Sequence, residues 1–305
     1  MTTATRLSLK TALGPMHGHL KAILDGAIQP EGASLELQDV PILGAFRSMC
    51  RTLNFDVCEM AVVTYFSARS YGIPMTAIPV FPLSNLIGRQ ANGPYTAHVD
   101  SGIKAPKDLE GKRLGVRSYT FTPGTWAKYL LKALDGVDLD KVNIVLNDEE
   151  HVEQYHADTP KNVDRRLGAD LLALHNAGEI EAGILMRAES PTIAPAFVDL
   201  KPRVEDFCRR AGVTPVDHTV VIRSALLQEH PWLARAVYDA ITAAKAEWRK
   251  RTPDAPADGD LYWDPMPVGL DNTRKTLEML VQASVEAHVL KQPLDVDELF
   301  PGNLN

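Results

Sequence analysis

Short apolar segments with a period of two alternate, along the first 90 residues, with longer segments whose apolar positions are three or four residues apart. The first pattern is typical of β-strands and the second of amphipathic helices. Strands are predicted at 7–13, 33–40, 55–60 and 76–81, and helices at 19–27, 43–53 and 62–71. Strands that alternate regularly with helices predict βαβ units and a largely parallel sheet, which is an α/β fold.

The same alternation continues after residue 100, so a second α/β unit is expected. Strands are predicted at 113–117, 141–146, 178–185 and 218–222, and helices at 122–134, 169–177, 203–211, 231–250 and 272–291. Residues 147–165 are predicted to form a long polar loop. With 305 residues the chain exceeds a typical single domain. We therefore expect a first lobe of residues 1–97 and 218–305 into which a second lobe, residues 98–217, is inserted, with the ligand in the cleft between the lobes.

The stretch KRLGVRSYTFTPGTW (112–126) is the strongest candidate for a ligand site. A short apolar strand leads directly into a helix whose first turn carries a proline, and hydroxyl residues suitable for capping precede it. The free N–H groups of such a corner, together with the positive end of the helix dipole, bind anions. Arg117, Tyr119, Thr122 and Trp126 are its candidate binding residues. An ordinary strand–helix turn with hydroxyl caps is the alternative.

Three histidines and a glutamate next to predicted strands are candidate site residues, His17 for substrate binding and the other three for acid–base chemistry. His17 and His19 lie in the first strand–helix turn, and Glu59 lies at the end of the third strand. His218 opens the strand at which the chain returns to the first lobe, and a histidine that titrates near neutral pH is suited to moving one proton. The alternatives are a solvated surface turn for His17 and His19, a helix-capping carboxylate for Glu59 and a structural histidine for His218.

Two arginines at the ends of strands complete the candidate binding residues. Arg89 follows the fourth strand and Arg187 follows the strand at 178–185, so both are expected at the cleft. Surface positions are the alternative. Common signatures of nucleotide-dependent enzymes, zinc proteases and serine hydrolases are absent from the sequence.

Composition narrows the class of protein further. The formal net charge of −7 argues against nucleic acid as a partner. Three cysteines without a CxxC pair favour reduced thiols in the cytoplasm, and the N-terminal residues lack the apolar segment of a secretory signal. No apolar run is long enough to span a bilayer. We expect a cytoplasmic protein without a membrane partner, and a homo-oligomer is left open.

Several motifs together resemble one known family. They are FDVCEM (55–60), GIPMTAIPVFP (72–82), SGIKAPKDLEGKRLGV (101–116), GVTPVDHTVVI (212–222) and PVGLDNTRKTLE (267–278). In this order they resemble the 4,5-dihydroxyphthalate decarboxylase family, whose fold is that of type 2 periplasmic-binding proteins. The resemblance implies a two-lobed fold related to the solute-binding proteins of ABC transporters.

The resemblance also implies an activity, which is loss of CO2 from an aromatic acid without an organic cofactor. His218, Glu59 and the corner residues Tyr119, Thr122 and Trp126 match residues of the family. For this chemistry we assign His218 as proton carrier, Glu59 or His19 as partner of a ring hydroxyl, and the corner as anchor of a second carboxylate. No metal ligand is assigned, and a divalent metal is left open.

The sequence departs from the family pattern in two segments that are expected to face the ligand. MHGH (16–19) stands where the family has YDRT, and LSNLIGRQ (83–90) retains Arg89 without an adjacent histidine. The expected substrate is therefore a small anionic acid, either a hydroxylated aromatic or a heterocyclic one. A non-catalytic protein that binds such acids is the alternative function, and the missing secretory signal favours the enzyme.

Overall fold

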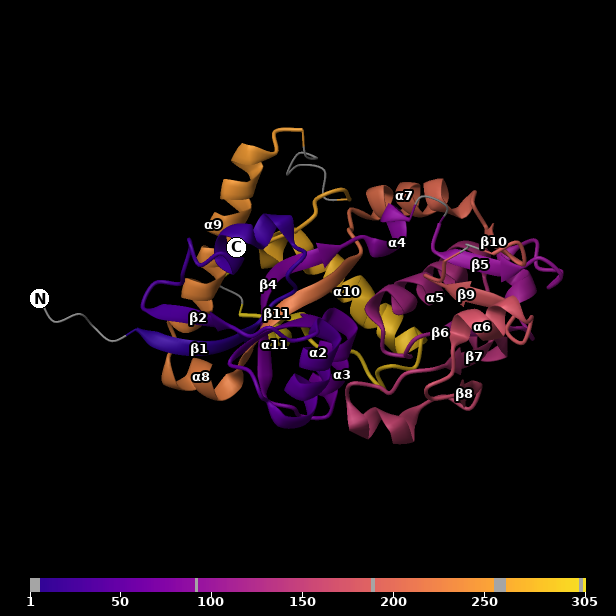
Figure 1. Cartoon of the computed structure of the whole chain (residues 1–305), viewed down its shortest axis with the longest axis horizontal. Coiled ribbons are helices and arrows are strands. Elements are labelled where there is room, and N and C mark those ends of the chain that lie inside the picture. The colour runs from indigo at the N-terminus through magenta and orange to yellow at the C-terminus, as the bar shows by residue number, and fades with distance from the viewer. Residues whose placement is uncertain (1–5, 91–92, 188–189, 255–261, 302–303) are drawn as a thin grey trace, which may run out of the picture.

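The computed structural model describes residues 6–90, 93–187, 190–254, 262–301 and 304–305. Within these residues, helices surround two β-sheets, one on the left and one on the right of Figure 1. The strand order is β2-β1-β3-β11-β4 in the first sheet and β10-β5-β9-β6-β7-β8 in the second. The predicted α/β fold is therefore confirmed.

The strands are β1 (Leu7–Ala12), β2 (Ala33–Leu37), β3 (Val57–Ala61), β4 (Met75–Ser84), β5 (Tyr95–His98), β6 (Arg113–Val116), β7 (Asn143–Leu146), β8 (Val163–Arg165), β9 (Ala182–Ile184), β10 (Ile193–Ala196) and β11 (Val216–Arg223). The α-helices are α1 (Lys21–Leu24), α2 (Ile42–Thr52), α3 (Val62–Ser70), α4 (Leu86–Arg89), α5 (Thr122–Asp135), α6 (Leu171–Asn176), α7 (Leu200–Ala211), α8 (Ser224–Glu229), α9 (Leu233–Arg251), α10 (Leu270–Glu286) and α11 (Val296–Leu299). Short 3-10 helices are η1 (Gly18–Leu20), η2 (Pro106–Leu109), η3 (Leu139–Lys141) and η4 (Glu153–Asp158).

The first sheet is mixed and not largely parallel as predicted. Strand β1 runs parallel to β2 and β3, whereas β11 is antiparallel to both β3 and β4. The cause is the path of the chain, because β11 enters this sheet only after the chain has passed through the second one. The register places His218 opposite Ala61 and Val220 opposite Glu59.

The boundary predicted at residue 97 falls inside β5 and is corrected by the strand pairing. All of β5 pairs with β9 and β10 of the second sheet. Tyr95 is buried there, and its hydroxyl donates a hydrogen bond to the carbonyl of Ala127 in α5. The chain therefore passes to the second sheet between Ser84 and Tyr95, earlier than predicted.

Helix α9, predicted at 231–250, packs on the first sheet through an apolar stripe. Leu233, Val237 and Ile241 are fully buried in one cluster with Leu9 and Ile78. Burial of each such side chain stabilises the fold by about 1.5–3 kcal/mol. The stripe therefore anchors α9 to the sheet that carries the candidate site.

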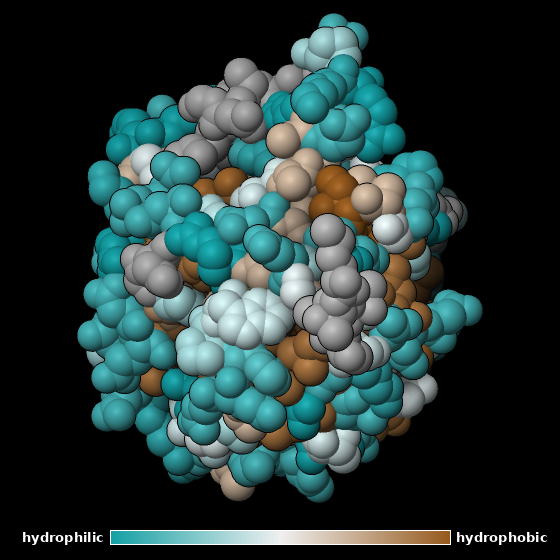
Figure 2. Space-filling model, turned by 90° about the vertical axis from the view of Figure 1, so that its left-hand side faces the viewer, coloured by the Kyte–Doolittle hydropathy of each residue, from teal (hydrophilic) through white to brown (hydrophobic). Residues whose placement is uncertain are grey.

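Helix α10 lies between the two sheets in Figure 1 and contacts both α3 and α5. The face at the end of the first sheet is mainly hydrophilic, with its apolar residues in small separate patches (Figure 2).

In the described part of the chain, no helix combines the length and the apolar character that crossing a membrane requires. All three cysteines are buried and free, as their number suggested.

Candidate active site

Glu59 and His218 lie side by side although 159 positions separate them in the sequence. Glu59 belongs to β3, all of whose residues are buried, and its side chain is only 1% exposed. His218 projects from the antiparallel neighbour β11, and its Nδ1 atom lies 2.5 Å from Oε1 of Glu59. Central strands of this kind are normally apolar on both faces. A buried carboxylate at this position needs hydrogen-bond donors to replace water, and His218 supplies one of them.

The turn after β1 supplies two more donors to the same carboxylate. Nε2 of His17 lies 2.9 Å from Oε1 and 3.1 Å from Oε2 of Glu59. The backbone N–H of Gly14 donates to Oε2 at 2.7 Å. A Cβ atom on residue 14 would lie 2.7 Å from Nε2 of His17 and 3.0 Å from Oε2 of Glu59. The close approach of this turn to Glu59 therefore requires glycine.

The shared carboxylate determines where the ring protons lie. Burial alone would raise the pKa of Glu59, but the hydrogen bonds from His17 and His218 outweigh it and hold the pKa well below its usual 4.5. An ionised carboxylate only accepts hydrogen bonds. Each neutral ring therefore carries its proton on the nitrogen that faces Glu59, which is Nε2 of His17 and Nδ1 of His218.

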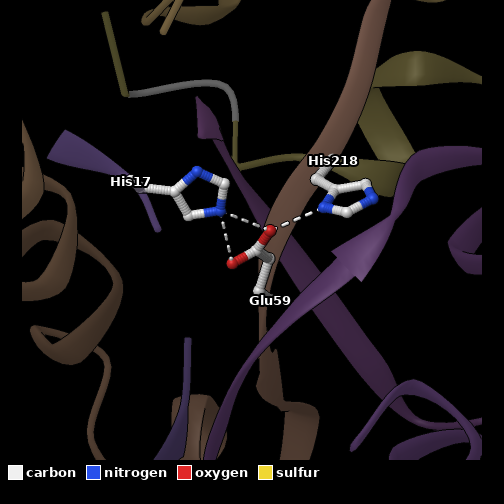
Figure 3. Close-up of side chains that lie close together, drawn as sticks. All are labelled: His17, Glu59 and His218. Carbon is white, nitrogen blue, oxygen red and sulfur yellow. Dashed lines mark hydrogen bonds and ion pairs between the residues drawn. The ribbon is translucent and has the colours of Figure 1, made fainter. Parts of the chain in front are cut away.

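The second nitrogen of each ring keeps its lone pair and points away from the carboxylate (Figure 3). These atoms are Nδ1 of His17 and Nε2 of His218. Both side chains are 13% exposed, so neither is sealed from solvent. The arrangement can accept one proton at each of two positions, with one negative charge that stabilises either imidazolium.

His19, predicted as a partner of the hydroxyl, is turned away from Glu59. Its Nε2 lies 2.8 Å from the carbonyl oxygen of Pro82, and its ring stacks on that of His17 at 5.4 Å. Burial, followed by the nearby His17, lowers the pKa of His19 to about 4. The catalytic assignment of His19 is therefore corrected. His17, predicted only as a binding residue, takes the place beside the carboxylate.

The predicted anion-binding corner does hold a carboxylate, but that carboxylate is Glu150 of the protein itself. Oε1 of Glu150 accepts from the N–H of Tyr119 at 2.5 Å. Its Oε2 accepts from the N–H of Thr120 at 3.1 Å and from the Thr120 hydroxyl at 2.6 Å. The Tyr119 ring is buried and stacks on Tyr155. The corner therefore has the predicted chemistry with an internal occupant.

Two further corner residues connect the sheets. The Thr122 hydroxyl accepts a hydrogen bond of 3.0 Å from the N–H of Val63, at the start of α3. Nε1 of Trp126 donates at 3.0 Å to the carbonyl of Val216 in β11. Both side chains are fully buried. Their predicted contact with substrate is therefore replaced by a structural role between the first and second sheets.

The three predicted arginines lie in different environments. Arg89 donates from Nε to the carbonyl of Ser84 at 3.1 Å and from a terminal nitrogen to that of Trp263 at 3.2 Å, so it braces the backbone. Arg117 pairs with Asp148 at 3.1 Å. Arg187 is exposed beyond β9. The structure does not bring the three together.

Comparisons with known proteins identify the family. The chain is 30% identical over 271 residues to the 4,5-dihydroxyphthalate decarboxylase of Comamonas testosteroni, with 83% of this chain and 79% of the relative covered. The chain belongs to the 4,5-dihydroxyphthalate decarboxylase family. The Pseudomonas putida protein of the same name is 28% identical over 65% of this chain and 76% of its own. The recognition made from the sequence motifs is confirmed, and so is the expected enzyme class, a carboxy-lyase.

Other similarities of this family member concern its fold. Residues 61–167 match the family model described as NMT1/THI5 like. Among solved structures, the alkanesulfonate-binding protein SsuA from Xanthomonas axonopodis pv. citri, bound to MOPS, aligns with a TM-score of 0.55 at 10% identity. The alignment covers 98% of this chain and 99% of that one. The predicted periplasmic-binding-protein fold is therefore confirmed.

The side chains of His17, Glu59 and His218 also have the composition of a divalent-metal site. One ligand atom from each residue lies within 4.8 Å of the other two. Two imidazoles with one carboxylate are a common donor set for first-row metals. Because a coordinating nitrogen must be deprotonated, a metal would replace the ring protons that face Glu59. Metal binding and acid–base chemistry are thus alternative uses of these three residues.

Four residues in and around the candidate active site were not predicted from the sequence. Gly14 lies in the turn that was noted only for its histidines, and Phe46 lies in the helix predicted at 43–53. Glu150 and His151 belong to the segment predicted as a solvated polar loop, but both are buried. The density of ionisable residues in 147–165 gave no signal of this burial, because solvated loops have the same composition.

Proposed function

We propose that this protein decarboxylates a hydroxylated aromatic or heterocyclic carboxylic acid by acid–base catalysis at His17, Glu59 and His218. The family relationship supports decarboxylation. The observation that carries the mechanism is the single buried carboxylate shared by two histidines. It gives one site with two proton-accepting nitrogens, and the reaction needs two proton transfers.

The chemistry explains why two proton carriers are required. Direct loss of CO2 from an aromatic ring would leave an aryl carbanion, which is very unstable. A hydroxyl ortho or para to the carboxylate avoids this. When the hydroxyl loses its proton and the ring carbon that bears the carboxylate gains one, the C–C bond breaks with its electrons returning to the ring. CO2 leaves, and aromaticity is restored as a phenolate.

In this mechanism the outer nitrogen of His17 takes the hydroxyl proton and later returns it to the phenolate. His218, as imidazolium, donates the proton that remains on the ring carbon and is reprotonated from water. Glu59 stabilises each imidazolium while it exists. General acid–base catalysis of this kind contributes about 10²–10⁴-fold to the rate.

The test is turnover by paired histidine variants. We would measure CO2 release from a panel of hydroxybenzoates, hydroxyphthalates and hydroxylated heterocyclic acids. His218→Gln should lower kcat by about 10²–10⁴-fold while ligand affinity changes by a few fold. His288→Gln is the matched control, because its Nε2 also pairs with a carboxylate, Asp140, at 2.7 Å, but on the surface. It should retain full activity.

Three outcomes would overturn the proposal or its mechanism. A fully active His218→Gln enzyme would remove His218 from the mechanism. Tight binding of these acids without CO2 release would favour the alternative, a binding protein, which the likeness to SsuA supports. Dialysis against a chelator distinguishes acid–base catalysis from metal binding at His17, Glu59 and His218. Activity that survives it agrees with acid–base catalysis, whereas activity lost and then restored by a divalent cation would replace the mechanism.

A further inference from the structure

Strand β4 departs from its neighbour β11 for a short stretch beside the candidate active site. Val220 of β11 lies opposite Ile78. Two positions earlier, His218 lies opposite Leu83, so two steps along β11 span five along β4. The stretch between these pairs is PVFP (79–82), and its two prolines have no N–H to give to a neighbouring strand. This part of the motif noted in the sequence therefore places irregular backbone next to the site.

The carbonyl at the end of this stretch, that of Pro82, accepts a hydrogen bond from a side chain. The donor is Nε2 of His19, 2.8 Å away. Because a carbonyl only accepts, the ring proton of His19 is on Nε2. His19 is 8% exposed, and burial together with the nearby His17 lowers its pKa, so the ring is neutral at physiological pH. His19 is therefore held in one tautomer.

Two aromatic contacts fix the plane of the His19 ring. It stacks on His17, with centroids 5.4 Å apart and 28° between the planes, and it meets the Trp248 ring edge-on at 5.9 Å. Trp248 belongs to α9, which is anchored to the first sheet, and the turn η1 packs on the same helix. His19 therefore supports one face of His17 from a rigid part of the fold.

His17 depends on such support more than His218 does. His218 belongs to a central strand with a regular ladder to β3, and the Phe46 ring packs edge-on against its ring at 5.1 Å. His17 lies in a turn, directly before η1, and among the described residues the hydrogen-bond partner of its ring is Glu59 alone. A ring that is bonded at one atom can still turn about that bond. The stacked ring of His19 removes this freedom.

We propose that His19 is a positioning residue, which keeps the N–H of His17 directed at Glu59 and the outer nitrogen of His17 directed at the substrate. His19 itself exchanges no proton with the substrate. The inference rests on the proposed function, because the orientation of His17 serves the proton transfer assigned to it there. The PVFP stretch of β4 also gains a functional reason, since it supplies the carbonyl that holds His19.

The experiment is a double-mutant cycle on kcat for CO2 release. His19→Leu removes the ring and the bond to Pro82, and it should lower kcat about ten- to a hundredfold with little change in KM, because a misdirected His17 loses the alignment that proton transfer needs. In the His17→Gln background the same substitution should have almost no further effect, since the ring that it positions is gone. His19→Phe keeps a stacking ring and should have a kcat about two- to tenfold above that of His19→Leu.

His175→Leu is the matched control. His175 is also a fully buried histidine bonded to a backbone carbonyl, because its Nδ1 lies 2.9 Å from the oxygen of Ile180, but it belongs to α6 beside the second sheet. The variant should lower Tm and keep kcat within a few fold.

Nitrogen NMR of histidine-labelled protein reads the tautomer of His17 without any turnover, and His17→Gln assigns its signals. Wild-type protein should show mainly the form protonated at Nε2, and His19→Leu a mixture of both tautomers.

The outcomes separate this inference from the proposed function. A wild-type kcat in His19→Leu, or an equal loss in both backgrounds, would overturn the positioning role and leave the decarboxylase proposal intact. A changed His17 tautomer in His19→Leu, without turnover of any acid by the wild-type protein, would overturn the proposed function alone. Should His19→Leu not fold, Trp248→Leu removes the support behind the His19 ring instead. An unchanged His17 tautomer in that variant would refute the inference.

Discussion

Replacement of Glu59 by glutamine tests the most specific feature of the site, which is one carboxylate shared by two histidines. The amide has almost the same shape but no charge, and one of its two polar groups donates instead of accepting. Gly14 N–H already needs an acceptor at Oε2. If the amide oxygen takes that place, the NH2 group faces Nδ1 of His218, which must then accept. The His218 proton moves to Nε2, and the ring can no longer take up a proton at that atom.

The size of the effect follows from two contributions. An imidazolium that loses a charge-assisted hydrogen bond loses about 1.5–3 kcal/mol of stabilisation, which is about ten- to a hundredfold in rate. The wrong tautomer adds to this, and in serine hydrolases the equivalent carboxylate-to-amide change lowers turnover by about 10⁴. We therefore expect Glu59→Gln to lower kcat between about 10² and 10⁴, with a small change in KM.

The assay is CO2 release under saturating substrate, with thermal unfolding measured in parallel. Glu150→Gln is the control for loss of a buried carboxylate, because Glu150 also accepts hydrogen bonds from backbone N–H groups. It should lower Tm but keep kcat within a few fold. A Glu59→Gln enzyme that folds and keeps most of its kcat would refute the reasoning, since neither histidine would then depend on the charge.

The remaining predictions concern pH and stability. Burial raises the pKa of Asp217 from 3.8 to about 7, so the folded protein holds a proton that the unfolded chain releases. The free energy of unfolding should fall as pH rises from about 4 to 7, at up to about 1.4 kcal/mol per pH unit. Asp217→Asn should remove this slope. The measurement is urea unfolding of wild type and variant at several pH values, and a slope that persists in the variant would contradict the assignment. Burial lowers the pKa of Lys128 from 10.5 to about 7. The free energy of unfolding should therefore rise between pH 7 and 10. Lys128→Met should stabilise the protein most at pH 7 and below, and progressively less up to pH 10. An equal effect at pH 6 and pH 10 in the same assay would contradict this.

Local structure was predictable because side-chain periodicity encodes it directly. The strands at 7–13 and 113–117 and the helix at 231–250 lie where the pattern placed them. Glu59 and His218 were also candidates from their places at strand ends. Their mutual contact was not predictable, because strand pairing across 159 residues depends on where the chain returns.

The direction of side chains in irregular turns was the main feature that could not be predicted from the sequence. His17 and His19 are two residues apart, and the pattern offered no reason to prefer one as the partner of Glu59. The 3-10 turn η1 decides this, since it turns His19 toward Pro82. Glu150 shows the same limit for loops. Its carboxylate meets the N–H groups of Tyr119 and Thr120, and composition alone cannot distinguish such an internal partner from a solvated acid.

The position of β11 between β3 and β4 has a consequence for how the protein is made. During synthesis β3 and β4 are complete long before residues 216–223 leave the ribosome, so until then their facing edges have no partner. Unpaired apolar strand edges are sites of misassembly. Contacts between residues so distant in the sequence also slow folding. Nascent chains that end before β11 should therefore be aggregation-prone clients of chaperones. The contact between Glu59 and His218 can form only when this last strand inserts and closes the sheet.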